Sequence, residues 1–313
     1  MPQSTLGEVK AIVVGETLMD SINHPGEPPK EHPGGSPLNM AIGLGRLGHP
    51  AMLVTWLGSD ARGDIIKEHL AESSVCLVPG ADKAERTSTA HIVTDETGHP
   101  AYTFDLLWQV PPVPDEAKPL VVHAGSMGAV FEPGADDVHA ILAAGRQTAT
   151  VTYDPNIRPD VMGTPENVRH LIERLVGVSD VVKVSDEDLN WLYPGADPGF
   201  SAEKWATMGP VLVILTRGVQ GATALRLRGG ELSAVEVPAD TSLEVADAVG
   251  AGDSFMSGLI HALWERGLLG ADRRAALAAL PDEELRGILA FAARIAAITV
   301  SRTGANPPWL REL

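Results

Sequence analysis

The chain of 313 residues has a single cysteine, Cys76. An intramolecular disulfide is therefore excluded, and a lone thiol of this kind is typical of a small apolar side chain in a strand. Such sparse cysteine usage fits a reducing compartment. The first residues show no basic stretch before an apolar core, and no apolar run approaches the roughly 18 residues of a membrane span. We expect a cytoplasmic protein without a signal peptide.

Aromatic rings and positive charge are also scarce. Aromatic residues make up 4% of the chain, and 41 acidic residues outnumber 24 basic ones, for a net charge of −17. A field of that sign repels phosphate backbones and anionic lipid, and few rings are present to stack on bases. We therefore expect neither nucleic acid nor a membrane surface as a partner. An anionic small substrate would need a local basic or backbone N–H site.

What the sequence does contain is a regular alternation of strand and helix patterns. Buried strands are predicted at Val9–Val14, Ala51–Leu57, Leu120–His123, Val151–Asp154, Val181–Val184 and Val211–Thr216. Helical patterns between them are Pro37–Leu47, Ile65–Ala71, Asp136–Ala144, Asn167–Val176 and Glu187–Leu192. This alternation predicts an α/β fold with a doubly wound, mostly parallel sheet and helices on both faces. The length fits one domain over residues 1–313.

Two stretches interrupt that alternation. Ser21–Pro33 is rich in Pro and Gly, and Thr87–Phe104 has two period-two segments around a turn at Gly98–His99–Pro100, which predicts a hairpin. We expect residues of about 21–33 and 87–108 to form a small β-lid that projects from the main sheet. A second hairpin is predicted at Ala222–Leu227 and Leu232–Val237, and two long helices near Asp253–Arg266 and Asp282–Ser301 end the chain.

The segment Gly43–Gly48 matches the dinucleotide fingerprint G-x-G-x-x-G. That fingerprint binds a pyrophosphate only where a strand turns into a helix. Here Ser36 is predicted to cap the start of the helix, with Pro37 in its first turn, and Gly48 to follow the end of the helix. The glycines therefore favour a helix end, and an NAD-dependent dehydrogenase loses its main support.

Polar residues at the start of that helix suggest a ligand site. Gly34 and Gly35 permit close approach of a ligand to the backbone, and Asn39 offers a donor and an acceptor to a hydroxyl. Asp20 follows the first strand, and ligands of open α/β sheets bind beyond the carboxyl ends of strands. The positions alone are equally compatible with a tight turn and a solvated loop aspartate.

The strongest motif is Asp247–Phe255, DAVGAGDSF. A glycine-rich turn runs directly into an amphipathic helix, whose free N–H groups and dipole would form an anion hole. Asp253 lies in the first turn of that helix, where the dipole favours the carboxylate, so it could accept a proton at neutral pH. A simple turn with a capping residue does not account for the whole motif.

Together, GGSPLNMAIGLGRLG and DAVGAGDSFMSG resemble the two signatures of the ribokinase-like (PfkB) family of carbohydrate kinases, in their usual order and separation. Two further segments support the resemblance. TRGVQG at 216–221 is similar to the T-x-G-x-x-G nucleotide loop, and YDPNIRP at 153–159 is similar to a D-P-N-x-R segment of the sugar kinases. The resemblance covers nearly the whole chain and implies a ribokinase-like fold.

The family's roles carry over to matching positions of this sequence. The resemblance implies Asp253 as catalytic base, the N–H groups of Gly250, Ala251 and Gly252 as the anion hole, and Arg158 beside the transferred phosphate. It implies a sugar site made by Asp20, Gly34, Gly35, Asn39 and Asn156. It implies a nucleotide site made by Thr216, Gly218, Gly221 and Lys183. The projecting strands would close over the sugar and exclude water.

The cofactors that the resemblance implies are ATP and Mg²⁺, with K⁺ as an activating cation. The family's N-x-x-E motif, which holds Mg²⁺ through water, appears here with Ser185 and Asp188, so Asp188 or Glu187 is the expected metal residue. Asp247 and Val249 are the matching positions for the monovalent cation, beside residues 301–305. Ala248 stands where the family often has Thr. Ten histidines show no H-x-x-x-H or similar spacing, which argues against zinc.

The sequence thus predicts an ATP-dependent sugar kinase that phosphorylates a primary hydroxyl, with fructose as the expected substrate because TFD at 103–105, DPNIRP and KVSDEDL resemble the fructokinase branch. A 2-keto-3-deoxygluconate kinase and a ribokinase are the alternatives. The acid substrate of the former should need a cationic side chain, and Thr89–Gln109 contains no Lys or Arg. A non-catalytic sugar or nucleotide sensor on the same fold is the alternative from another class. The resemblance also implies a homodimer formed through the lid.

Overall fold

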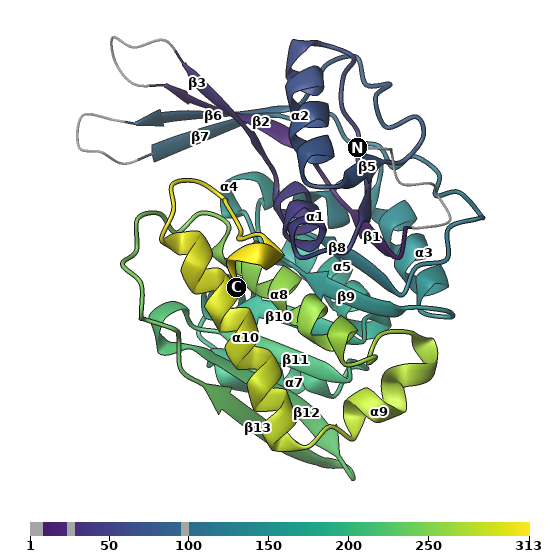
Figure 1. Cartoon of the computed structure of the whole chain (residues 1–313), viewed down its shortest axis with the longest axis vertical. Helices are drawn as coiled ribbons and strands as arrows, with labels where there is room; N and C mark the ends of the chain where they lie inside the picture. The colour runs from purple at the N-terminus through teal and green to yellow at the C-terminus, as the bar shows by residue number, and fades with distance from the viewer. Residues whose placement is uncertain (1–8, 24–28, 95–99) are drawn as a thin grey trace.

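The structure is a computed structural model and describes residues 9–23, 29–94 and 100–313. Its large sheet contains nine strands in the order β13-β12-β11-β10-β9-β8-β1-β4-β5. Their bounds are β1 Ala11–Val14, β4 Ala51–Val54, β5 Val75–Leu77, β8 Val121–Gly125, β9 Thr150–Asp154, β10 Val181–Ser185, β11 Leu212–Thr216, β12 Ala222–Arg228 and β13 Glu231–Val237. From β5 to β11 all neighbours are parallel, and β12 and β13 add an antiparallel hairpin. The predicted mostly parallel sheet and the hairpin are confirmed (Figure 1).

Helices cover both faces of this sheet. The helices are α1 Ser36–Arg46, α2 Ala61–Glu72, α3 Ala135–Gly145, α4 Pro159–Met162, α5 Pro165–Val178, α6 Asp186–Leu192, α7 Pro198–Ala206, α8 Ala251–Glu265, α9 Arg274–Ala278 and α10 Asp282–Val300. Strand side chains alternate between two apolar clusters: Ala11 and Val13 join the cluster of α1, α2, α8 and α10, whereas Ile12 and Val14 join that of α3, α5, α6 and α7. This arrangement is the doubly wound α/β fold that the sequence predicts.

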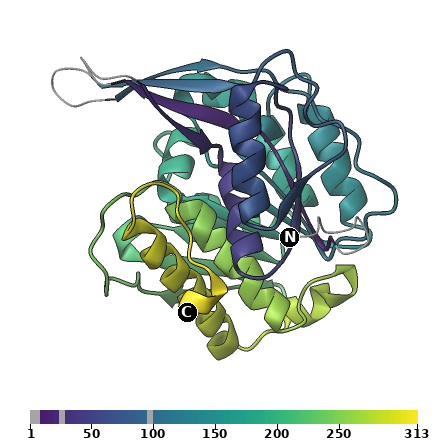
Figure 2. The ribbon, with the colours of Figure 1, turned by 45° about the horizontal axis from the view of Figure 1, so that its top comes forward.

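A second, four-stranded sheet has the order β3-β2-β6-β7. Its strands are β2 Leu18–Asn23, β3 Lys30–Gly34, β6 Thr89–Thr94 and β7 Pro100–Asp105. The sheet projects away from the large sheet at one end of the molecule, as the predicted lid should (Figures 1 and 2). The β6–β7 hairpin is confirmed, while its turn at residues 95–99 and residues 24–28 of the predicted lid lie outside the described residues. The two strands β2 and β3 were not predicted as strands.

The glycines of the G-x-G-x-x-G segment serve helix packing. A Cβ on Gly43 would lie 2.4 Å from Ser257 Oγ of α8, and one on Gly45 would lie 1.8 Å from the Ser73 carbonyl oxygen. Both glycines lie inside α1, which ends at Arg46, and Gly48 follows with a φ of 90°. The helix-end interpretation of this segment is therefore confirmed. Close contact between α1 and α8 also brings their N-termini together, and this positions the site described next.

Candidate active site

The N-terminus of α8 forms the centre of the site. Gly250 precedes the helix in the left-handed conformation (φ 78°), and a Cβ there would lie 2.7 Å from the Cβ of Ala305, so only glycine fits. The first N–H groups of a helix have no partner within it, and they carry the positive end of the helix dipole. The segment Gly250–Gly252 therefore lies where an anion hole is expected, although the Ala251 N–H donates to the Ala248 carbonyl over 3.3 Å.

Asp253 is buried in the first turn of α8, and three side-chain donors point at its carboxylate. Ser36 Oγ donates to Oδ1 over 2.6 Å, Asn39 Nδ2 to Oδ2 over 2.9 Å, and Asn156 Nδ2 to Oδ1 over 3.5 Å. The structure thus brings together Asp253, Asn39 and Asn156, as expected. Ser36 was predicted as the helix cap, but Gly35 occupies that position and Ser36 is the first residue of α1. Its hydroxyl holds the carboxylate of Asp253 instead.

We expect Ser36→Ala to lower kcat about tenfold, because a hydrogen bond to a charged group contributes about 1.5–3 kcal/mol and aims the carboxylate. The KM for ATP should not change. Steady-state kinetics on the variant measure both, and Ser36→Thr, which keeps the hydroxyl, should recover most of the activity. Ser201→Ala is the matched control, since Ser201 is an equally buried serine near the start of α7. An unchanged kcat in Ser36→Ala would remove Ser36 from the site.

Asp20 lies on β2 of the small sheet, and its carboxylate lies directly over Gly34. A Cβ on Gly34 would come within 2.1 Å of Asp20 Oδ2, so the glycine makes room for this side chain. Burial raises the pKa of Asp20 to about 6, and the nearby His32 and Arg158 partly oppose that rise. The carboxylate is placed to accept hydroxyl groups of a ligand between the small sheet and α1.

The loop after β9 carries the D-P-N-x-R segment. Asn156 has a φ of 38°, and its side-chain oxygen accepts a hydrogen bond from Arg158 Nη1 over 2.8 Å. The Ile157 N–H donates to Asp188 Oδ1 over 2.8 Å, which anchors the loop to α6. The guanidinium of Arg158 is exposed at the loop and remains a predicted phosphate contact.

Lys183 lies buried beneath the anion hole. Its Nζ is 3.0 Å from Asp154 Oδ2, and a Cβ on Gly252 would lie 3.1 Å from the same nitrogen. Burial alone would lower the pKa of Lys183, but Asp154, Asp188 and Asp253 outweigh that effect and raise it, so the ammonium is charged. Asp154 Oδ1 has no hydrogen-bond partner among the described residues. A positive charge is thus fixed below the helix terminus where the sequence predicts phosphate.

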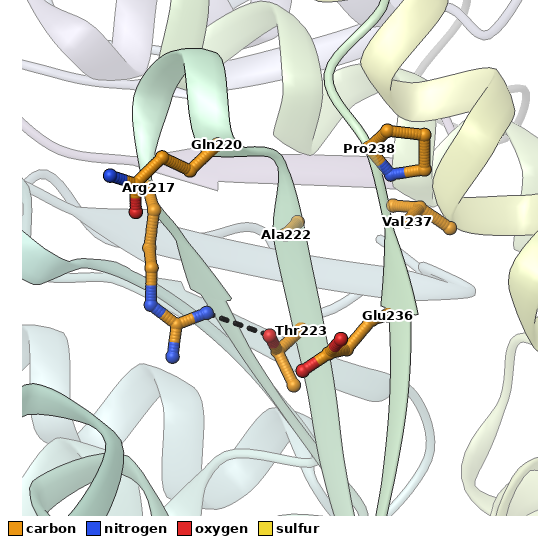
Figure 3. A pocket seen from close by; sticks show the side chains of 7 residues that line it. All are labelled: Arg217, Gln220, Ala222, Thr223, Glu236, Val237 and Pro238. Atoms are coloured by element: carbon orange, nitrogen blue, oxygen red, sulfur yellow. Dashed lines mark hydrogen bonds between the residues drawn. The ribbon is translucent and has the colours of Figure 1, made fainter.

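The predicted nucleotide loop follows β11. Thr216 ends the strand, Gly218 begins a single turn that closes at Gly221, and the Arg217 N–H donates to the Gly221 carbonyl over 2.8 Å. An open pocket of about 490 Å³ lies beside this loop, lined by Arg217, Gln220, Ala222, Thr223, Glu236, Val237 and Pro238 (Figure 3). Arg217 Nη1 donates to Thr223 Oγ1 over 2.7 Å. The sequence does not predict Arg217 or Glu236 as pocket residues, because strand pairing brings β12 and β13 beside the loop.

The predicted monovalent-cation loop packs against the end of α10. Asp247 Oδ1 accepts the Val249 N–H over 3.0 Å, and Oδ2 accepts the Gly304 N–H over 2.9 Å. The N–H groups of Ala246 and Asp247 both donate to the Val300 carbonyl. The structure therefore brings together Asp247 and residues 301–305, the two segments that the family resemblance assigns to a cation loop.

The expected Mg²⁺ residues lie in different surroundings. Asp188 is buried, and its two oxygens accept N–H groups of Ile157 and Ser185. Ser185 in turn caps α6 through the Asp188 N–H. Each oxygen keeps a lone pair for a water-mediated contact. Glu187 is exposed on the first turn of α6. Of the two, Asp188 fits a metal held through water near Lys183 and Asp253.

Glu16 is a further buried carboxyl group that sequence analysis missed. Its Oε2 accepts the Gly128 N–H over 2.7 Å, its Oε1 has no partner among the described residues, and burial raises its pKa to about 7. The Glu16 carbonyl oxygen would lie 2.7 Å from a Cβ on Gly35, so Glu16 lies directly behind the Gly34–Gly35 turn. The sequence signal that could have identified Glu16 is its position directly after the first predicted strand, where ligands of open α/β sheets bind.

A family model described as the pfkB family carbohydrate kinase matches residues 6–312. The chain belongs to the pfkB family of carbohydrate kinases. It is 32% identical over 306 residues to a fructokinase of Klebsiella pneumoniae, and the match covers 95% of this chain and 94% of that relative. The predicted family and enzyme class, a phosphotransferase with an alcohol group as acceptor, are confirmed.

Solved structures show the same fold. A fructokinase with bound ATP from Xylella fastidiosa superposes with a TM-score of 0.80 at 24% identity, over 96% of this chain and 94% of that one. A fructokinase variant of Vibrio cholerae O395 in its fructose-, ADP- and potassium-bound form gives a TM-score of 0.72 at 23% identity, over 95% and 94% of the two chains. Both confirm the ribokinase-like fold. Among the helices of the described residues, none has the length and apolar character needed to cross a bilayer.

Proposed function

We propose that this pfkB-family protein is an ATP-dependent fructokinase. The observation that carries the proposal is the position of Asp253 at the N-terminus of α8, held by Ser36 and Asn39. The same carboxylate lies within one helical turn of Gly250 and Gly252. A base for a hydroxyl and a set of donors for a phosphoryl group thus share one helix end. We assign fructose as the sugar because several relatives of this chain are fructokinases.

In the proposed reaction, the primary hydroxyl oxygen of the sugar attacks the γ-phosphorus of ATP. A new P–O bond forms, the bond to the bridging β–γ oxygen breaks, and ADP leaves. The hydroxyl proton passes to the carboxylate of Asp253. N–H groups at Gly250–Gly252 and the ammonium of Lys183 stabilise the negative charge on the phosphoryl group. Arg158 would add a planar donor from the opposite loop.

The proposal places ATP beside the loop of Thr216, Gly218 and Gly221, in the region of the pocket of Figure 3. Mg²⁺, when bound, would neutralise charge on the β- and γ-phosphates, and Asp188 is the residue that would hold it through water. K⁺ is proposed at the loop of Asp247 and Val249, because the structure ties this loop to residues 301–305. The Vibrio cholerae fructokinase structure with a potassium ion supports this choice.

The proposal treats residues 1–313 as one kinase domain with the small sheet as its lid over the sugar. Strands β3 and β7 are the two edges of that sheet, and an unpaired edge invites pairing with a second copy. We include a homodimer through the lid in the proposal, and sedimentation analysis of the purified chain tests it. The cytoplasm is the proposed compartment, since ATP is the proposed donor.

Charge at the lid favours a neutral sugar over an acid. Arg62 Nη2 lies 2.5 Å from Glu31 Oε1, and Arg86 pairs with Asp105. These two arginines are therefore neutralised by carboxylates, so neither is a free cation for an anionic substrate such as 2-keto-3-deoxygluconate. Ribose remains the alternative neutral substrate.

The test is a coupled assay of ADP release with fructose, ribose, 2-keto-3-deoxygluconate, adenosine or no sugar, at fixed Mg²⁺ with and without K⁺. Turnover on fructose far above the others supports the proposal. Faster turnover on another acceptor would keep the kinase mechanism and overturn the assigned sugar. No ADP release with any acceptor, in protein that binds ATP, would favour the non-catalytic sensor.

We expect kcat/KM for fructose to fall as the pH falls through about 6. The carboxyl of Asp20 accepts sugar hydroxyls when ionised, and its raised pKa means that it is charged above about pH 6 and neutral below. Below about pH 6, kcat/KM for fructose should fall by nearly tenfold for each pH unit. Initial rates at saturating ATP between pH 5 and 8 measure it, and Asp20→Asn should raise the KM for fructose and remove this limb. If the variant keeps the same limb, another group controls the profile.

A further inference from the structure

Two histidines and a glutamate meet at the far ends of α1 and α8. His49 follows α1, and His261 and Glu265 are four residues apart on α8, on one face of the helix. His49 Nε2 lies 2.8 Å from His261 Nδ1 and 3.9 Å from Glu265 Oε1. One ligand atom from each residue falls within 4.8 Å of the others. With a rise of about 1.5 Å per residue, His261 and Glu265 lie roughly 12 and 18 Å from Asp253 along α8.

The surroundings of the cluster fix the orientation of both rings. Trp264 stacks on His49 with ring centroids 4.2 Å apart, and Phe291 of α10 stacks on His261 at 5.2 Å. The Leu47 carbonyl accepts a hydrogen bond from the ring of His261. A backbone carbonyl bound to one ring nitrogen leaves the other nitrogen as a lone-pair donor, the arrangement typical of histidines that bind metals.

The protonation state and access also suit a metal ion. Burial, with His261 as a smaller contribution, lowers the pKa of His49 to about 4, and burial lowers that of His261 as well, so both rings are neutral at pH 7. Neutral imidazole is the form that ligates metals. The side chain of Glu265 is 60% exposed, whereas that of His49 is 7% exposed. An ion could therefore enter past Glu265 and reach the buried nitrogens.

We propose that His49, His261 and Glu265 form a Zn²⁺ site that joins the C-terminal ends of α1 and α8. Two imidazole nitrogens and one carboxylate, with water in the fourth position, are a tetrahedral set that zinc prefers. Ligand bonds of about 2.0–2.1 Å at tetrahedral angles put the nitrogens about 3.3 Å apart. The two rings need to separate by only a fraction of an ångström from their present 2.8 Å.

The site would act on the active site through the helices. Ser36 and Asn39 lie in the first turn of α1, and Asp253 lies in the first turn of α8. Zinc at the opposite ends would hold α1 and α8 in one relative position. The ion takes no part in phosphoryl transfer, so the site stands independently of the proposed substrate.

The test is equilibrium binding of Zn²⁺ to the metal-free full-length protein, without nucleotide, in competition with a chromophoric chelator. We expect one ion per chain and a melting temperature that rises with Zn²⁺ concentration. Glu265→Gln should weaken binding at least tenfold and His261→Gln at least a hundredfold. Glu265 is exposed at the helix end, so its variant should fold normally. Replacement of Zn²⁺ by Co²⁺ should give the strong visible absorption of a tetrahedral site.

The matched control is His139→Gln. His139 lies on α3 beside Asp136, in another histidine–carboxylate pair one turn apart on a helix. Its loss should leave Zn²⁺ affinity and stoichiometry unchanged. Absence of stoichiometric binding in the unmodified protein would overturn the proposal. Equal affinity in Glu265→Gln and the unmodified protein, or an octahedral Co²⁺ spectrum, would overturn it as well.

Discussion

Replacement of Asp253 by Asn should lower kcat by about a hundred- to ten-thousandfold, the range that a lost general base removes. The amide keeps the size of the side chain and can still accept from Ser36 or Asn39, so the site should stay assembled. It cannot take the hydroxyl proton at neutral pH. Binding of fructose and ATP, measured by calorimetry, should change less than tenfold. The coupled ADP assay measures the loss of turnover.

Asp64→Asn is the control for this experiment. Asp64 is an exposed carboxylate in the first turn of α2 that pairs with Lys67, so its neutralisation alters the same kind of helix terminus without touching the contacts of Asp253. We expect full activity in that variant. Wild-type kcat in Asp253→Asn would show that another group accepts the proton, and a parallel loss of sugar binding would indicate that Asp253 mainly holds the substrate.

The fold was predictable because its core strands are short, β-branched and separated by helical periods. The strands β2 and β3 were not. Strand β3 is mostly exposed or half-buried and contains Pro33 and Gly34, and β2 places polar residues among its apolar ones, so neither shows the apolar run of a buried strand. The hairpin β6–β7 showed alternation and was found. The local sequence pattern therefore predicts the core strands of the large sheet, which are buried on both faces, but not all strands of the small projecting sheet.

The site was predictable where a motif is local and not where contacts are distant. Gly250–Asp253 form a continuous segment, so their position at a helix terminus follows from the sequence. The contact of Ser36 with Asp253 spans 217 positions, and the hydroxyl looked like a cap because serine favours that place. The contact between His49 and His261 spans 212 positions, so no metal-ligand motif of short residue spacing contains both. Such pairs follow only from the packing of α1 on α8.

Replacement of Lys183 by Met should lower the free energy of unfolding by about 3–5 kcal/mol, the cost of leaving buried charge without its partner. The side chains of Lys183 and Asp154 are 5% and 2% exposed, and Asp188 and Asp253 lie close enough to raise the pKa of the lysine. Urea or guanidinium denaturation measures the change. Lys204→Met is the matched control, because Lys204 forms a 2.9 Å pair with Glu173 at 58% exposure. Exposed pairs contribute about 1 kcal/mol or less.

The double variant Lys183→Met with Asp154→Asn separates the structural from the nucleotide-binding part of this prediction. Removal of both charges should recover much of the lost stability, since a neutral buried pair has no unpaired charge. ATP affinity should not recover, because the ammonium beneath Gly252 is what faces the phosphates in the proposed complex. If ATP binds the stable double variant as tightly as the unmodified protein, Lys183 serves the fold alone and the anion hole depends on backbone N–H groups. If stability fails to recover, the lysine is instead held chiefly by Asp188 and Asp253.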